Sequence, residues 1–341
     1  MSVWDTNGPG NDIVITSRVR VARNVAGIPF PSAMTAEQGD SIAQSVMGAV
    51  RRNADFKNSK YIQLRSIDET TRMELVERHL ASRDLISNPD VGSILLSCDE
   101  TTALMINEED HLRIQGLLPG LQIEEAAQKA LGAEAAIEKS VPFAFHDSLG
   151  YLTACPTNVG TGMRASVMVH LPALKHIGML KVLIDSVVKA GLAVRGIYGE
   201  GSEALGDMFQ ISNQITLGIS EEDITSTMKA VCDQIMDKER LARDMLLRSK
   251  RLEVEDRLFR SWGVLRHARC MSAKEFMELL SDVRLAVSLG FLTELTQTDL
   301  NRLMIAVQPA SLQRHAGRDL TAEERDIIRA NYIRTALHQT H

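Results

Sequence analysis

Hydrophobic and polar residues alternate along the first two thirds of the chain in short runs that are typical of β-strands. In residues 13–24, IVITSRVRVARN, the side chains of Arg18 and Arg20 fall on one face of a strand, and those of Val19 and Val21 fall on the other. Similar patterns predict further strands at residues 61–67, 93–97, 101–106, 111–117, 164–171, 193–199 and 209–218.

Amphipathic helices are indicated between the strands, where hydrophobic residues recur every three or four positions. These helices are expected at residues 34–52, 71–85 and 172–192. Because the strands come in clusters and do not alternate one by one with helices, we expect an α+β fold with a largely antiparallel sheet flanked by helices.

After residue 220 the strand patterns end and only helical patterns follow. They cover residues 221–246, 254–269, 273–290, 299–308 and 322–339. Two of these helices begin with a capping box, Ser272 with Glu275 and Thr321 with Glu324. The last hundred residues are therefore expected to be all-helical.

The length of 341 residues allows one large domain or two moderate ones. The change of pattern predicts a mixed domain over residues 1–245 and a helical C-terminal domain over residues 246–341. The net charge of −6 argues against a general nucleic-acid binder. The sequence has neither a membrane-span window nor a signal-peptide pattern at its N-terminus, so we expect a cytoplasmic protein.

Charged residues gather in NEEDHLRIQG, residues 107–116. Strand alternation places His111, Arg113 and Gln115 on one side, and it adds Glu109 to them if the strand begins that early. The cluster is either a solvated, salt-bridged edge or a set of groups that handles a charged substrate. Taken alone, the solvated edge is the more frequent case.

A second cluster, SRVRVAR, contains Arg18, Arg20 and Arg23. Arginine makes forked contacts with phosphate oxygens, so two arginines on one strand face can straddle a polyphosphate. The alternative is an edge strand protected by charge.

Glycines and a cysteine define a third stretch, CPTNVGTGMRASV, residues 155–167. Gly160 and Gly162 permit a tight loop, and the stretch lacks the ending of a Walker loop. Cys155 is either an inert buried thiol or a thiolate beside cationic groups. The four cysteines form no C-x-x-C pair, so neither a zinc site nor a disulfide framework is indicated.

A fourth stretch, VRGIYGEGSEALGD, suggests a mobile loop that presents Glu200. Together the four stretches resemble the phosphagen kinases, the ATP:guanidino phosphotransferases. The resemblance rests on SRVR at 17–20, NEEDHLR at 107–113, CPTNVGTGMRASV at 155–167 and RGIYGE at 195–200, in the family's order, and it covers about residues 13–245. It implies a glutamine-synthetase-like catalytic domain.

Within the family the chain is most similar to the bacterial protein-arginine kinases. Small-substrate members carry an additional N-terminal helical domain, whereas here the SRVR motif starts at residue 17. Tyr198 also stands where animal arginine kinases carry a second arginine. The C-terminal stretch RDIIRA, residues 325–330, is similar to the phosphoarginine-binding motif of the bacterial enzymes. This points to arginine carried on a polypeptide as the phosphate acceptor.

The resemblance assigns a role to each motif residue. A protonated guanidinium has a pKa above ~12 and no free lone pair, so a carboxylate must orient it and accept a proton. Glu109 and Glu200 are expected in that role, with Cys155 as a third anionic partner. The implied nucleotide-binding residues are Ser17, Arg18, Val19, Arg20, Val21, His79, Arg113, Arg164, Ala165, Ser166, Val167, Met168, Arg195, Gly196, Ile197, Tyr198 and Gly199, and the implied phosphoarginine-sensing residues are Arg325, Asp326, Arg329 and Ala330.

The resemblance also implies cofactors and partners. ATP and Mg²⁺ are expected, with no dedicated metal site on the protein. The implied partners are arginine-bearing protein substrates such as a CtsR-type repressor and misfolded proteins, a zinc-finger activator of the McsA type, and the ClpC–ClpP protease that degrades marked proteins during stress. A homodimer or larger homo-oligomer is expected.

Three other functions stay open from the sequence alone. The chain can be a kinase of free arginine or another small guanidino compound, a non-catalytic phosphoarginine-binding adaptor, or a nucleic-acid-binding module. The acidic net charge and the aromatic content of 4% speak against the last of these.

Overall fold

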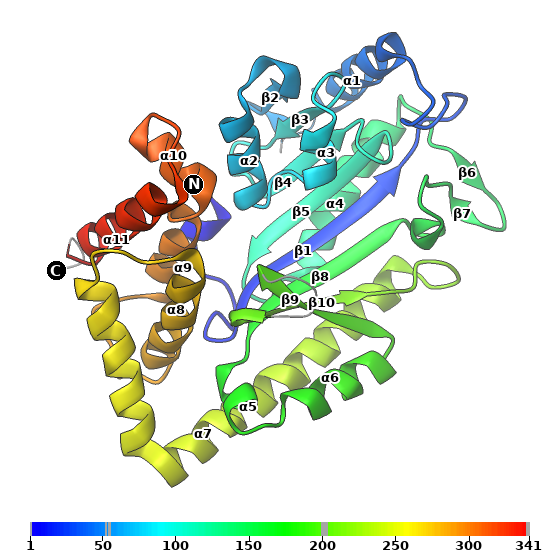
Figure 1. Cartoon of the computed structure of the whole chain (residues 1–341). Coiled ribbons are helices and arrows are strands. Elements are labelled where there is room, and N and C mark those ends of the chain that lie inside the picture. The colour runs from blue at the N-terminus through cyan, green and yellow to red at the C-terminus, as the bar shows by residue number, and fades with distance from the viewer. Residues whose placement is uncertain (1, 52, 54–55, 199–203, 339–341) are drawn as a thin grey trace.

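The computed structural model describes residues 2–51, 53, 56–198 and 204–338. Its centre is a sheet of the strands β1 (Val14–Arg23), β2 (Lys60–Gln63), β3 (Ser93–Leu96), β4 (Thr102–Ile106), β5 (Leu112–Pro119), β8 (Met163–His170), β9 (Leu192–Tyr198) and β10 (Ala204–Asn213). They lie in the order β2-β3-β4-β5-β1-β8-β10-β9, and every neighbouring pair is antiparallel. A short hairpin of β6 (Phe145–His146) and β7 (Gly150–Tyr151) projects beside the sheet (Figure 1). The predicted antiparallel α+β fold is confirmed.

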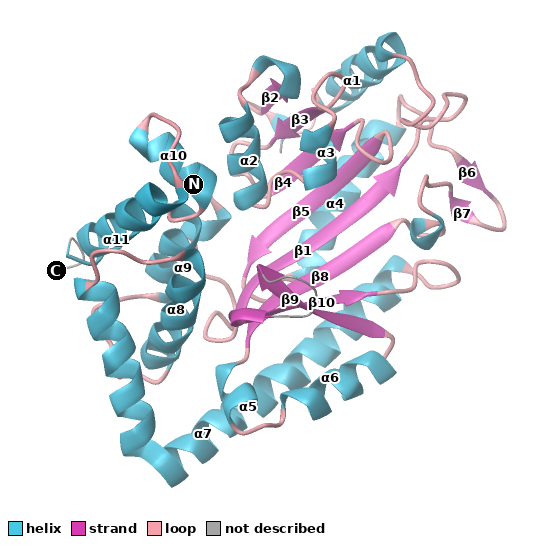
Figure 2. Cartoon of the chain, viewed as in Figure 1, coloured by secondary structure: helices cyan, strands magenta, loops and turns pink. Residues whose placement is uncertain are grey.

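Helices surround the sheet and form a separate group at the C-terminal end (Figure 2). They are α1 (Ala36–Val50), α2 (Glu69–Glu77), α3 (Arg83–Ser87), α4 (Ile123–Glu138), α5 (Pro172–His176), α6 (Leu180–Lys189), α7 (Glu221–His267), α8 (Ala273–Ser288), α9 (Gln297–Ala306), α10 (Pro309–Ala316) and α11 (Ala322–His338). The described ranges also contain the short 3-10 helices η1 (Val3–Asp5), η3 (Leu64–Ser66) and η4 (Pro156–Asn158). None of the helices in the described ranges is long and apolar enough to cross a membrane.

The two faces of the sheet are covered differently. The valines of β1 and the leucines and isoleucines of β4 and β5 form one core with α1, α4 and α7. An added Cβ at Gly116 of β5 would lie only 2.1 Å from the carbonyl oxygen of Ala126, so glycine lets α4 pack directly on the strand. On the opposite face of the sheet, α2 and α3 cover the β2-β3-β4 end. Figure 1 shows α4 passing behind β5 and β1, which leaves the near face of the central strands to the polar side chains described below.

Several predicted helices have other bounds. The segment 71–85 forms two helices, since the chain turns at His79 with a left-handed φ of 60°. The segment 172–192 is divided into α5 and α6 at Gly178, where φ is 74°. Two other predicted helices, 221–246 and 254–269, are joined in α7, which is kinked at Lys250. The predicted domain boundary after residue 245 therefore falls inside α7, just before its kink.

Candidate active site

The register of the central strands brings the predicted arginines onto one face of the sheet. Arg20 of β1 lies opposite Arg164 of β8, and Arg18 lies opposite Ser166. Because residues that face one another across strands point to the same side, β1 and β8 place these arginines together. On the other side of β1, Arg113 of β5 lies opposite Ala22, which has the same parity as Arg20.

Arg195 completes the group from the edge strand β9. It lies opposite Gln210 of β10, which in turn lies opposite Met168 of β8. Met168 has the parity of Arg164, so Arg195 points to the same side of the sheet. We call this side the arginine face, and it carries Arg18, Arg20, Arg113, Arg164 and Arg195.

The cations on the arginine face repel one another. Burial lowers the pKa of Arg20 well below its ordinary value, and the charges of Arg18 and Arg113 lower it further. Burial also lowers the pKa of Arg164, together with the charges of Arg195 and Arg113. The Nε atom of Arg20 is buried and has no hydrogen-bond partner among the described residues. Such a cluster favours an anion that carries several negative charges.

A cavity of about 260 Å³ opens beside the arginine face. It is lined by Arg20, Ala22, Asp84, Glu109, Arg113, Cys155, Thr157, Asn158, Gly162 and Arg164. We call it the Cys155 cavity. It joins Glu109 and Cys155 with three of the predicted arginines, although these residues come from three separate stretches of the sequence.

Glu109 reaches the cavity from a turn and not from a strand. Strand β5 begins at Leu112, and residues 107–111 form the connection between β4 and β5. The strand thus begins too late to include Glu109, so the condition under which alternation would group Glu109 with His111 is not met. A carboxylate oxygen of Glu109 lies 3.4 Å from Nη2 of Arg113, and 41% of the side chain is exposed, so it can exchange this contact for another cation.

Glu108 is a site residue that the sequence patterns missed. Its buried carboxylate lies 2.5 Å from Nη1 of Arg113 and accepts a hydrogen bond from the hydroxyl of Ser82. Burial raises the pKa of Glu108, and the charge of Arg113 opposes that shift. Glu108 thus holds the Arg113 guanidinium in position. Because Glu108 lies in a turn, strand alternation could not predict where its side chain points.

Asp110 ties the turn to the loop that carries Cys155. One of its carboxylate oxygens accepts hydrogen bonds of 2.6 Å from the Asn24 side chain and from the backbone N–H of Ala154. The neighbouring His111 is buried, and its Nδ1 accepts a hydrogen bond of 3.0 Å from the backbone of Val25. Asp110 and His111 therefore organise the site and do not line its cavity.

Cys155 precedes η4 and is partly exposed. Its Sγ lies 3.0 Å from Oγ1 of Thr157, and its charge acts to raise the pKa of Arg164. Later in the same loop, Gly162 has a φ of 61°, and an added Cβ there would lie 2.7 Å from the carbonyl oxygen of Ala22, so glycine lets this loop pass close to β1. Of the other cysteines, Cys98 and Cys270 are exposed, and burial raises the pKa of Cys232 to about 12.

His79 lies after the end of α2 and beside the arginine face. Burial lowers its pKa to about 3, and the charges of Arg18 and Arg20 contribute to this shift. The ring is therefore neutral at physiological pH. It makes an edge contact with Trp4 at 5.2 Å between ring centroids, and its backbone carbonyl accepts a hydrogen bond of 2.8 Å from Gln115.

Other predicted residues are not brought into the cavity. In β1 and β8, the residues Ser17, Val19, Val21, Ala165 and Val167 alternate with the arginines and point to the opposite, buried face, while Ser166 and Met168 share the arginine face. Gly196, Ile197 and Tyr198 lie in β9. Gly199 and Glu200 lie outside the described residues.

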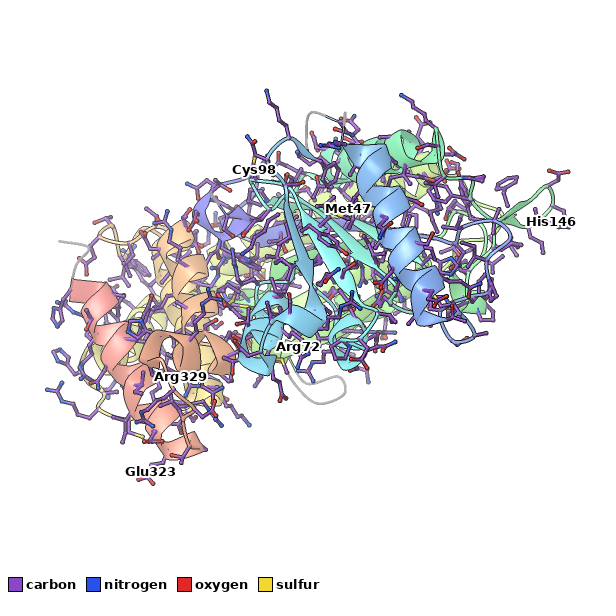
Figure 3. The ribbon with its side chains drawn as sticks, turned by 90° about the horizontal axis from the view of Figure 1, so that it is seen from above. Met47, Arg72, Cys98, His146, Glu323 and Arg329 are labelled. Atoms are coloured by element: carbon purple, nitrogen blue, oxygen red, sulfur yellow. The ribbon has the colours of Figure 1, made fainter. Side chains whose placement is uncertain are left out.

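The predicted phosphoarginine motif lies in α11, away from the Cys155 cavity. Arg329 is buried and donates hydrogen bonds to the carbonyl oxygens of Met271 and Val307 at 2.9 and 3.1 Å. It also lies 2.5 Å from a carboxylate oxygen of Asp326. Figure 3 places Arg329 among the C-terminal helices and His146 of the β6–β7 hairpin at the opposite end of the molecule. Arg325 donates a hydrogen bond of 2.9 Å to Leu320.

Among the described residues, no group of three or more His, Cys, Asp or Glu side chains is arranged to hold a metal ion.

Two family models match the chain. Residues 41–242 match "ATP:guanido phosphotransferase, C-terminal catalytic domain", and residues 251–341 match "Protein-arginine kinase McsB C-terminal domain". A protein-arginine kinase of Caldanaerobacter subterraneus subsp. tengcongensis is 46% identical over 330 residues, which cover 96% of this chain and 98% of the relative. A protein-arginine kinase of Halalkalibacterium halodurans is 47% identical over 339 residues, which cover 99% and 95%.

Solved structures of similar fold include the duplicated taurocyamine kinase from Schistosoma mansoni with bound transition state analog components. It has a TM-score of 0.61 and 28% identity, covering 69% of this chain and 34% of the duplicated one. A lombricine kinase has a TM-score of 0.60 and 26% identity, covering 70% of each chain.

Proposed function

The chain belongs to the ATP:guanido phosphotransferase family and is a protein-arginine kinase, and from this premise we propose which of its residues bind ATP and which handle the arginine acceptor. The arginine face binds the phosphates of ATP. The Cys155 cavity receives the guanidinium of an arginine in a protein substrate. The observation that carries the proposal is that one cavity joins Glu109 and Cys155 with Arg20, Arg113 and Arg164.

The donor side of the reaction requires neutralisation of charge. In phosphoryl transfer the protein aligns donor and acceptor and stabilises the negative charge on the phosphate oxygens. The guanidiniums of the arginine face repel one another in the free protein. A bound polyphosphate relieves this repulsion, and its binding is stabilised accordingly. Mg²⁺ binds through the phosphate oxygens of ATP, where it neutralises further charge. His79, neutral and beside Arg18, contacts the adenosine part of ATP.

The acceptor side requires a carboxylate. Glu109 pairs with the substrate guanidinium, orients one of its nitrogens toward the γ-phosphorus and accepts the proton which that nitrogen loses. The N–P bond forms as the bond between the γ-phosphorus and the bridging oxygen of ADP breaks. Cys155 as a thiolate supplies a second negative partner for the cation. Glu200, by the family resemblance, supplies a further carboxylate.

Incubation with Mg²⁺, ATP and an arginine-rich protein, followed by mass spectrometry under conditions that preserve acid-labile phosphoarginine, tests the proposal. Phosphoarginine is expected on the protein substrate. Phosphate on serine or threonine alone, or no transfer, would contradict it.

Cys155 is expected to react with iodoacetamide faster than the other three cysteines, because only this thiol is placed beside an arginine of the site. Cys98 and Cys270 serve as internal controls because they are exposed, while Cys232 is buried. Peptide mass spectrometry gives the rate for each cysteine. ATP together with an arginine peptide should slow labelling at Cys155 alone. Equal rates at Cys98, Cys155 and Cys270 would remove the thiolate from the mechanism.

The helical domain is proposed to bind phosphoarginine at RDIIRA and thereby to change activity at the distant site. Arg329 supports the fold through two carbonyl oxygens, so Arg325 is the residue to replace. Arg325→Ala is expected to weaken the binding of free phosphoarginine at least about tenfold in calorimetry, since a charged hydrogen bond to phosphate is lost. Arg318→Ala, which removes an exposed ion pair with Glu324, is the matched control. Unchanged affinity in Arg325→Ala would contradict the sensor role.

We further propose the cellular setting that the family resemblance implies. The enzyme acts in the cytoplasm as a homo-oligomer, under an activator of the McsA type, and marks a CtsR-type repressor and misfolded proteins for ClpC–ClpP during stress. A degradation assay with purified ClpC–ClpP tests this setting. A phosphorylated substrate that is degraded no faster than its unphosphorylated form would contradict it.

A further inference from the structure

The catalytic and helical domains meet where α2 ends against the start of α10. The carboxylate of Glu77, the last residue of α2, accepts hydrogen bonds from the backbone N–H groups of Ala310 and Ser311 at 2.7 and 2.9 Å. The hydroxyl of Ser311 donates a third hydrogen bond at 2.8 Å. A single acid of the catalytic domain thus binds the first turn of a helix that lies 233 residues later in the sequence.

This contact replaces a local helix cap. The first N–H groups of a helix have no partner within the helix and need an acceptor. Gln308 occupies the N-cap position of α10, but its side chain makes no capping hydrogen bond and donates to Met304. Burial raises the pKa of Glu77, and the donors from Ala310 and Ser311 oppose that shift. The carboxylate and the helix start therefore stabilise each other.

The same segment of chain leads directly to His79. Only Arg78 separates Glu77 from His79, which adopts the left-handed conformation with φ of 60°. The carbonyl oxygen of Arg78 accepts a hydrogen bond of 3.1 Å from the indole of Trp4, and Gln115 holds the carbonyl oxygen of His79. The backbone at His79 is therefore held by hydrogen bonds from Trp4 and Gln115, and the Glu77 contact with α10 lies two residues before it.

The N-terminal segment also joins this turn to the helical domain. Trp4 lies in η1, and the next residue, Asp5, pairs with Arg302 of α9 at 2.8 Å. Asn7 accepts a hydrogen bond of 2.5 Å from Thr298 of the same helix. Two separate sets of contacts therefore connect the helical domain to the His79 turn, one from α9 through the N-terminal segment and one from α10 through Glu77.

We propose that Glu77 is a positioning residue for ATP, which sets the His79 turn by holding the start of α10. The inference rests on the proposed place of His79 at the nucleotide. It gives the helical C-terminal domain a direct effect on ATP affinity, separate from any effect on the arginine acceptor.

The test compares Glu77→Gln with Glu74→Gln. A glutamine keeps the size of Glu77 but replaces one of its two acceptor oxygens by an NH₂ group. This group cannot accept a hydrogen bond from the N–H donors of α10. The KM for ATP is expected to rise about tenfold or more, the equivalent of one lost hydrogen bond to a charged group, while kcat stays within about twofold. Glu74 lies one turn earlier on α2 and pairs with the exposed Arg314 of α10. Glu74→Gln leaves the three hydrogen bonds of Glu77 intact, so it should leave KM within about twofold of the wild type.

A double-mutant cycle with His79→Ala separates positioning from a general loss of stability. If Glu77 acts through His79, Glu77→Gln raises the ATP dissociation constant in the wild-type background and leaves it unchanged in the His79→Ala background. An equal effect in both backgrounds, or none in either, overturns the proposal. If Glu77→Gln does not fold, Ser311→Ala removes one donor only and should raise the dissociation constant in the same direction by a smaller factor.

Calorimetric titration with ATP supplies these constants without an assay of phosphoryl transfer. A failure of arginine phosphorylation in the wild type would refute the proposed roles of the site residues. It would not affect the ATP dissociation constants from which the double-mutant cycle is judged. The two proposals therefore fail by different measurements.

Discussion

Glu109→Gln is expected to lower kcat for arginine phosphorylation by at least ~10²-fold, the range for a lost general base or orienting group. The glutamine retains the shape of the side chain but cannot accept the proton that leaves the guanidinium, and it pairs only weakly with a cation. Steady-state kinetics with a protein substrate gives kcat. ATP binding measured by calorimetry should persist, because Glu109 faces the acceptor cavity and its contact with Arg113 is long at 3.4 Å.

Glu125→Gln is the matched control for this prediction. Glu125 is an exposed acid on α4, behind the sheet, so the same chemical change there should leave kcat unaltered. Near-normal turnover of Glu109→Gln would exclude this residue from the chemical step. Loss of ATP binding would show that Glu109 acts on the donor side.

Arg20→Met should lower kcat by at least ~10³-fold, the range for an arginine that stabilises charge in phosphoryl transfer. The same change should raise the melting temperature of the ATP-free protein. Arg20 sits between Arg18, Arg113 and Arg164, and both burial and those charges disfavour its cationic form. Replacing this partly buried, poorly compensated cation by an apolar side chain of similar length removes that repulsion.

The measurement pairs a turnover assay with thermal unfolding in the absence and presence of ATP. Arg65→Met is the control, because Arg65 is exposed and its guanidinium makes surface contacts with Asp40 and the carbonyl oxygen of Asp90. It should change neither quantity appreciably. A lower melting temperature for Arg20→Met without ATP would mean that Arg20 stabilises the fold, contrary to the charge repulsion inferred from the site.

Strand alternation predicted part of the arginine face. A period of two residues placed Arg18 and Arg20 on one side of β1, whereas the grouping with Arg113, Arg164 and Arg195 was implied by the resemblance to the phosphagen kinases. The alternation pattern did not predict the register, that is, which residues of neighbouring strands lie opposite one another. That register, fixed by packing of the opposite face against α1, α4 and α7, decides which arginines lie opposite one another.

The parts of the site that lie in turns were not predictable in this way. Glu108, Asp110 and His79 lie outside regular elements, so no periodicity describes where their side chains point. Their positions come from contacts with residues distant in sequence, such as the hydrogen bond from Ala154 to Asp110. Helix α4 was also missed, because its alanine-rich buried face gives only a weak apolar pattern.

The contact between Glu77 and α10 shows a further limit of pattern reading. Helix α10 has Pro309 in its first turn but no capping side chain of its own. Its cap comes from Glu77, an acid that in the sequence is one of several on an amphipathic helix. Only the folded chain reveals that this acid is a partner of the C-terminal domain.

The most direct test of the account is a competition for phosphate between two acceptors. The protein is incubated with Mg²⁺, ATP, an unfolded arginine-containing protein and free arginine at an equal concentration of guanidino groups, and both products are quantified by mass spectrometry, with Glu109→Gln as the inactive control. Phosphoarginine is expected on the polypeptide with little phosphorylated free arginine, and neither product is expected with Glu109→Gln. Phosphorylation of free arginine with the polypeptide left unmodified would contradict the proposed binding of a polypeptide arginine in the Cys155 cavity.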